Sequence, residues 1–122
     1  MAHGKRILII DDDLTIVMIL KDLLQDAGYK VETASSMNVM EKTLSSLPDL
    51  ILLDMMMPGV SGVEVSQMLR SEARTNYIPI VAISAAATVE DMARRADTDA
   101  VLKKPFDMPQ VLHTIERLIG DS

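Results

Sequence analysis

Five short runs of aliphatic residues constrain the fold of this 122-residue chain more than any other feature. The runs at 7–10, 50–53 and 80–83 are strong, and those at 31–34 and 100–102 are weaker. The strong runs lack the alternation of apolar and polar residues that marks a strand with one face in water. We therefore expect strands that are covered on both faces, as in parallel sheets.

The segments between the runs have helical spacing. Apolar residues recur every three or four positions in two stripes: Val17, Leu20, Leu24 and Ala27, and Val111, Ile115 and Leu118. Asp13 and Asp107 are candidate N-caps, Gly28 and Gly120 suit helix ends, and Pro48 stops a helix across 37–46. A strand followed by a helix, five times over, predicts one doubly wound α/β domain over residues 1–122, with no effector domain in this chain.

Composition excludes several classes of binding partner and site. A net charge of −6 and a pI near 4.7 argue against direct binding of nucleic acid, which needs clustered cations. The absence of cysteine excludes disulfides and thiolate metal sites. No apolar segment is long enough for a signal peptide or a membrane span. We expect a cytoplasmic protein without membrane insertion.

Acidic residues follow two of the apolar runs. Asp11, Asp12 and Asp13 come directly after the first run, and Asp54 ends the third. In open parallel sheets, functional residues gather beyond the carboxyl ends of strands, where the strand order reverses. An order of 2-1-3-4-5 would make the first and third strand ends neighbours, although periodicity and spacing leave the order open.

Clustered carboxylates resist desolvation, so something cationic is expected among them. Asp11 and Asp12 are suited to holding Mg²⁺. Asp54 stands alone at its strand end, and a carboxylate beside Mg²⁺ can attack a phosphoryl group. Asp54 is therefore the candidate nucleophile.

The remaining strand ends add polar groups. Ser84 follows the fourth run, and Lys103 and Lys104 follow the fifth. An ammonium group would neutralise an additional anion. Because side chains alternate along a strand, only one of the two lysines can reach the site.

Four motifs together resemble the response-regulator receiver domain of bacterial two-component systems, in its single-domain, chemotaxis-regulator-like form. These are IDDD at 10–13, LILLDMMMPGVSG at 50–62, AISA at 82–85 and KPF at 104–106. The resemblance covers essentially the whole chain. It implies a flavodoxin-like five-stranded parallel sheet of order 2-1-3-4-5 with five helices.

The resemblance also implies roles for single residues. Asp54 would accept a phosphoryl group from a sensor histidine kinase or a histidine phosphotransfer protein. Asp11, Asp12, Asp54 and the backbone carbonyl of Met56 would form the site of Mg²⁺ (or Mn²⁺). Lys104, preceding a cis bond to Pro105, would contact the phosphate.

Ser84 would supply the hydroxyl that moves towards the phosphate. The chain would then be a phosphorylation-dependent switch, and not an enzyme with a separate substrate. It would change its surface for an output protein that the sequence leaves unknown. Neither Met56 nor Ala86 can orient an attacking water, which predicts slow loss of the phosphoryl group.

Two positions depart from the family pattern. Val101 replaces a common aromatic residue, and Asp97 replaces a familiar glycine before the fifth strand. These departures support an alternative, a pseudo-receiver that binds partners without phosphorylation. An aspartate-dependent phosphatase is a further alternative, but it would normally want a second acid where Met56 stands.

Overall fold

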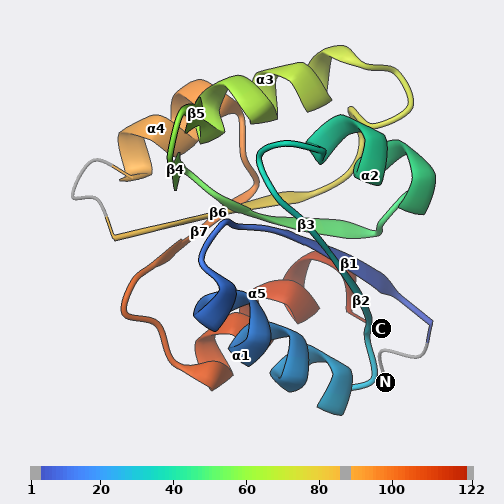
Figure 1. The fold of residues 1–122 in the computed structure, drawn as a ribbon. Coiled ribbons are helices and arrows are strands. Elements are labelled where there is room, and N and C mark those ends of the chain that lie inside the picture. The colour runs from blue at the N-terminus through green and yellow to red at the C-terminus, as the bar shows by residue number, and fades with distance from the viewer. Residues whose placement is uncertain (1–3, 86–88, 121–122) are drawn as a thin grey trace.

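The computed structural model describes residues 4–85 and 89–120 as alternating strands and helices (Figure 1). The elements in chain order are β1 (Arg6–Ile10), α1 (Leu14–Asp26), β2 (Lys30–Ala34), α2 (Val39–Ser46), β3 (Leu50–Asp54), β4 (Met56–Met57), β5 (Val60–Ser61), α3 (Gly62–Ser71), β6 (Ile80–Ser84), α4 (Val89–Ala96), β7 (Ala100–Lys103) and α5 (Met108–Ile119). No helix in the described part of the chain is long and apolar enough to cross a bilayer.

Five of the strands form one parallel sheet in the order β2-β1-β3-β6-β7. Since β6 and β7 are the fourth and fifth strands of this sheet, the predicted order 2-1-3-4-5 is confirmed. The central strands β3 and β6 are buried along their whole length. Their unbroken aliphatic runs follow from that double burial, because neither face meets water.

Helices cover both faces of the sheet, with α1 and α5 on one side and α2, α3 and α4 on the other (Figure 1). Alternation along each strand separates two cores. On β1, for example, Ile7 and Ile9 pack towards α1 and α5, whereas Leu8 and Ile10 pack towards the other three helices. The sheet is therefore a rigid partition between two apolar layers.

The predicted helix boundaries are largely confirmed. Asp13 caps α1 by accepting hydrogen bonds from the N–H groups of the first turn, and Asp107 forms a capping box at α5. Gly28 adopts a positive φ after α1. Helix α2 ends at Ser46, before Pro48. Leu47 between them has a left-handed conformation (φ 44°).

A short antiparallel hairpin of β4 and β5 follows β3, and the sequence analysis did not predict it. Met56 pairs with Ser61 and Met57 pairs with Val60, so Pro58 and Gly59 form a two-residue turn. Gly59 has a φ of 74°, a region that favours glycine. Strands of two residues are too short to show a periodicity, so the sequence does not predict this hairpin.

Candidate functional site

The carboxyl ends of β1 and β3 lie next to each other. Ile10 pairs with Leu53 in the register of these strands, and Asp54 pairs with Ile83 of β6. The residues that follow or end these strands therefore meet at one edge of the sheet. This edge brings together side chains from different strand–helix units, such as Asp11, Asp54 and Lys104.

Asp11 lies at the centre of this edge and is 4% exposed. Its Oδ1 accepts a hydrogen bond of 2.8 Å from the N–H of Asp13. Its Oδ2 is buried and has no hydrogen-bond partner among the described residues. Burial, reinforced by the negative charge of Asp54, raises the pKa of the Asp11 carboxyl to about 6, although the Asp13 N–H and the charge of Lys104 act in the opposite direction.

Asp54 is also buried, at 6% exposure, and lies beside Asp11. Its Oδ1 accepts a hydrogen bond of 3.0 Å from the N–H of Met56. Gly62, at the start of α3, closes in on the same segment: a Cβ there would lie 2.5 Å from Met55 Cα and 3.0 Å from the Asp54 carbonyl oxygen. Only glycine lets the helix approach this strand end so closely.

Asp12 is turned towards the neighbouring β2–α2 loop. Its Oδ1 accepts a hydrogen bond from the Ser36 N–H, and its Oδ2 accepts one from the Ser36 hydroxyl, both of 3.1 Å. The sequence analysis did not identify Ser36. Its position 24 residues from Asp12 carries no local signal, so only the pairing of β1 with β2 reveals it.

Of the two consecutive lysines, Lys104 reaches the acids. Its Nζ lies 3.9 Å from Asp11 Oδ2, whereas Lys103 is exposed. The backbone N–H of Lys104 donates to the Ser84 carbonyl, which ties the β7–α5 loop to the end of β6. Ser84 is buried at that end. The peptide bond between Lys104 and Pro105 is cis, as the resemblance implied.

The acids are suited to a divalent cation, although no three His, Cys, Asp or Glu side chains within residues 4–85 and 89–120 are already arranged as a metal site. Asp11 and Asp54 form a buried pair of like-charged groups. A single ammonium at 3.9 Å does not balance them. The buried Asp11 Oδ2, which lacks a hydrogen bond, is the kind of hard oxygen that Mg²⁺ prefers.

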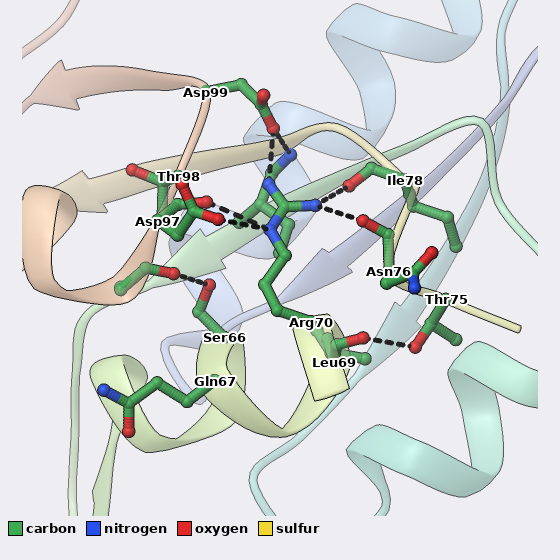
Figure 2. A network of polar contacts seen from close by, with 12 residues as sticks. Ser66, Gln67, Leu69, Arg70, Thr75, Asn76, Ile78, Asp97, Thr98 and Asp99 are labelled. Atoms are coloured by element: carbon green, nitrogen blue, oxygen red, sulfur yellow. Dashed lines mark hydrogen bonds and ion pairs between the residues drawn. The ribbon is translucent and has the colours of Figure 1, made fainter. Parts of the chain in front are cut away.

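At the opposite end of the sheet, Arg70 at the end of α3 binds the segments that lead into β6 and β7 (Figure 2). Its guanidinium donates to the carbonyl oxygens of Asp97, Asn76 and Ile78 and to Asp99 Oδ2, at 2.6 to 3.1 Å. Asp97 has a φ of 58°, so it occupies the left-handed conformation expected at a glycine position. The Arg70 contact with its carbonyl stabilises that turn.

Val101, the other departure from the family pattern, is half-buried on β7. It packs against the apolar layer beneath α2, α3 and α4. A small hollow beside it is lined by residues of α4 and β7, including Ala93 and Arg94. Position 101 therefore carries a packed aliphatic side chain.

The response regulator receiver domain family matches residues 7–116. The polar-differentiation response regulator DivK of Brucella ovis is 31% identical over 121 residues, covering 97% of this chain and 98% of that protein. The chemotaxis protein CheY4 of Vibrio cholerae is similar in structure, with a TM-score of 0.88 at 27% identity, over 95% of this chain and 99% of that one.

A further solved structure shares the fold. It is the receiver domain of the sensor histidine kinase PA1611 from Pseudomonas aeruginosa, described with a magnesium ion coordinated in its active-site cleft. Its TM-score is 0.87 at 24% identity, over 97% of this chain and 99% of that one. The family match covers most of this chain and agrees with the strand order and the acidic edge. The chain therefore belongs to the response regulator receiver domains of two-component systems.

Proposed function

We propose that this receiver domain is a phosphorylation-dependent switch in which Asp54 accepts a phosphoryl group. The observation that carries the proposal is the buried pair of Asp11 and Asp54, with the Lys104 ammonium beside it. Buried charges of one sign are costly unless a cation or an incoming group uses them. Their placement at the carboxyl edge of the sheet agrees with where ligands bind in such folds.

Each residue has a role in this reaction. An Asp54 carboxylate oxygen attacks the phosphorus of a phosphohistidine, and the bond between phosphorus and the histidine nitrogen breaks. The Met56 N–H orients the Asp54 carboxylate. Lys104 and the hydroxyl of Ser84 would contact the oxygens of the transferred group, which carries roughly two negative charges.

Asp11, Asp12, Asp54 and the Met56 carbonyl would hold Mg²⁺ (or Mn²⁺). The ion would compensate negative charge on the phosphoryl oxygens and on the carboxylates around them. The fit rests on the buried Asp11 Oδ2, and Asp12 would have to share its oxygens between the ion and Ser36. The magnesium in the PA1611 receiver domain agrees with this assignment for the shared fold.

The phosphorylated state would act by binding partners, and not by turnover of a substrate. A sensor histidine kinase or a histidine phosphotransfer protein would supply the phosphoryl group in the cytoplasm, and an unidentified output protein would read the altered surface. Phosphorylation can shift the population only as far as it favours one surface conformation over the other. Nucleic acid is not expected to bind directly.

Intact mass after incubation with acetyl phosphate and Mg²⁺ tests this proposal. Wild type should gain one phosphoryl group, and Asp54→Asn should gain none because an amide is not a nucleophile. Beryllofluoride, a phosphoryl mimic, should protect wild type and not Asp54→Asn in a thermal-shift assay. Wild type that neither gains mass nor responds to the mimic would refute the chemistry.

A pseudo-receiver would behave differently in a pull-down. If partners bind wild type and Asp54→Asn equally in the presence of beryllofluoride, the surface works without phosphorylation. Sustained release of phosphate from a phosphomonoester would instead indicate a phosphatase.

A further inference from the structure

Three consecutive methionines follow Asp54, and the structure treats them differently. Met55 and Met57 are 1% and 5% exposed and pack into the apolar layer under α2, α3 and α4. Met56 between them is 59% exposed. Alternation along β4 explains the difference between Met56 and Met57, since neighbouring side chains point to opposite sides, and Met55 precedes β4 beneath the start of α3.

Met56 is also bound to the phosphorylation site through its backbone. Its N–H donates to Asp54 Oδ1, which keeps residue 56 beside the carboxylate. Its side chain lines a surface hollow of about 490 Å³ between the β3–α3 segment and α4, which Met55, Met57, Val60 and Met92 also line. Of the three consecutive methionines, Met56 alone is exposed, so small molecules can reach its side chain from solvent.

The chain has no cysteine, so methionine is its most readily oxidised side chain towards peroxides. Exposure determines which methionines react, because the oxidant must reach the sulfur. Of the methionine triplet, only Met56 meets this condition. It is also the residue whose apolar side chain leaves an attacking water without a partner in the proposed switch.

We propose that Met56 is a modification site at which peroxides form methionine sulfoxide, and that this oxidation shortens the lifetime of the phosphorylated state. The Met56 sulfur attacks one oxygen of the peroxide, the O–O bond breaks and an S–O bond forms. With hydrogen peroxide the departing oxygen leaves as water, and sulfur loses the two electrons that the peroxide gains. The effect on lifetime rests on the proposed phosphorylation of Asp54.

The sulfoxide changes what residue 56 can do. A thioether is a weak hydrogen-bond acceptor, whereas a sulfoxide oxygen is a strong and polar one. It can accept a hydrogen bond from a water molecule beside the acyl phosphate and hold that water in place. The water oxygen then bonds to phosphorus, the bond from phosphorus to the Asp54 oxygen breaks, and inorganic phosphate leaves with the surplus proton passing to solvent.

The test treats the whole protein with dilute hydrogen peroxide, maps each methionine by peptide mass spectrometry, and measures decay of the phosphorylated form made with acetyl phosphate and Mg²⁺. Met56 should oxidise well before Met55 and Met57. Decay should become about tenfold faster, equivalent to about 1.4 kcal/mol in the barrier. Incubation with thiol-driven methionine sulfoxide reductases should restore the original decay, which unfolding damage would not allow.

Other methionines, such as Met18 and Met37, are more exposed than Met56 and will also oxidise. Two variants, each compared with its own untreated sample, test whether the change in decay comes from position 56. Met56→Leu cannot form a sulfoxide at this position, so peroxide should leave its decay rate unchanged. Met68→Leu removes a methionine of α3 that is 44% exposed and distant in sequence from the site. Its decay should still accelerate as in wild type.

Three results would overturn the inference: unchanged decay when mapping shows Met56 oxidised, equal acceleration in Met56→Leu, or oxidation of Met55 and Met57 as fast as that of Met56. If untreated protein acquires no phosphoryl group, the proposed function fails and takes the lifetime effect with it. The order of methionine oxidation, read by mass alone, still tests the modification site separately.

Discussion

At the scale of residues, the site concentrates negative charge where water cannot solvate it. Asp11 and Asp54 are both more than nine-tenths buried, and Lys104 approaches Asp11 only to 3.9 Å. Asp12 satisfies its oxygens with Ser36. Two buried carboxylates with one ammonium nearby are costly, so changes in their charge should be measurable as changes in stability.

The first prediction concerns Asp11. Its pKa of about 6 in the folded protein lies above the ordinary value of about 4, so the folded state binds this proton more tightly than the unfolded chain does. Stability without metal should therefore fall as pH rises from about 4 to about 6 and stay lower above that. Asp11→Asn removes the charge, and its amide oxygen can still accept the Asp13 N–H.

Urea unfolding in the presence of a chelator measures this effect. Asp11→Asn should be more stable than wild type by on the order of 2 kcal/mol at about pH 7.5, and the gain should disappear near pH 4. Added Mg²⁺ should stabilise wild type more than the variant. A variant that is no more stable at neutral pH than at pH 4, relative to wild type, would contradict the assigned cause.

The second prediction concerns the water that ends the phosphorylated state. Met56 offers no side chain to orient it, and Ala86, the other residue named for this role, lies outside the described residues. Met56→Asn supplies an amide oxygen beside Asp54, so decay of the phosphorylated form should accelerate about tenfold. Radiolabelled phosphate or intact mass over time follows the decay, with Met68→Asn as a control. An unchanged rate would show that residue 56 does not limit hydrolysis.

At the scale of elements, the two ends of helix α3 contact opposite ends of the sheet. One lies at the acidic edge and the other lies where β6 and β7 begin. The first turn of α3 presses on Met55 through Gly62, and its last turn places Arg70 against the turn between α4 and β7. A shift of α3 would therefore move both the Asp54 segment and the Asp97 turn. Helix α3 links the acidic edge to the opposite end of the molecule.

The third prediction tests the close approach at Gly62. A Cβ in Gly62→Ala would clash with the backbone of Met55 and must displace α3, at a cost of about 2 kcal/mol. Phosphorylation by acetyl phosphate should slow because the displaced contact shifts Asp54 and Met56 from their positions at the site. Gly59→Ala is the matched control: its Cβ would meet no atom within 4 Å, so it bears only the strain of a positive φ. Equal losses of phosphorylation rate in the two variants would contradict the positioning role.

The fourth prediction tests the Arg70 network (Figure 2). Arg70→Met keeps the aliphatic stem but leaves the carbonyls of Asp97 and Ile78 without this donor, and should cost about 3 kcal/mol of stability by urea unfolding. Arg74→Met, which removes an exposed ion pair with Glu72, should leave the unfolding midpoint unchanged. If both variants unfold alike, the network does not stabilise the turn.

At the scale of the whole molecule, most of the fold could be predicted from local signals. Unbroken aliphatic runs identified the sheet, and Asp13 and Asp107 marked helix starts because capping is decided within one turn. The strand order came from the family resemblance, since periodicity is the same for any order. Ser36, the β4–β5 hairpin and the Arg70 contacts depend on pairing between distant segments, and so the sequence offered no local sign of them.

The same division applies to the site. The ends of the predicted strands showed which residues lie at the acidic edge. They did not show which of these side chains contact one another. Alternation indicated that only one of Lys103 and Lys104 reaches the site, and the choice of Lys104 came from the family resemblance. The structure places Lys104 near Asp11 and turns Asp12 to Ser36. We propose that Asp54, among these acids, is the residue that accepts the phosphoryl group.

The most direct measurement of that claim locates the phosphoryl group itself. After reaction with acetyl phosphate and Mg²⁺, borohydride reduces an aspartyl phosphate to homoserine, which peptide mass spectrometry identifies by position. We predict homoserine at Asp54 alone, with the signal lost when a chelator removes Mg²⁺ and strongly reduced in Lys104→Met. Homoserine at Asp11 or Asp12, or at no position while a receiver domain known to be active is labelled in parallel, would contradict the account.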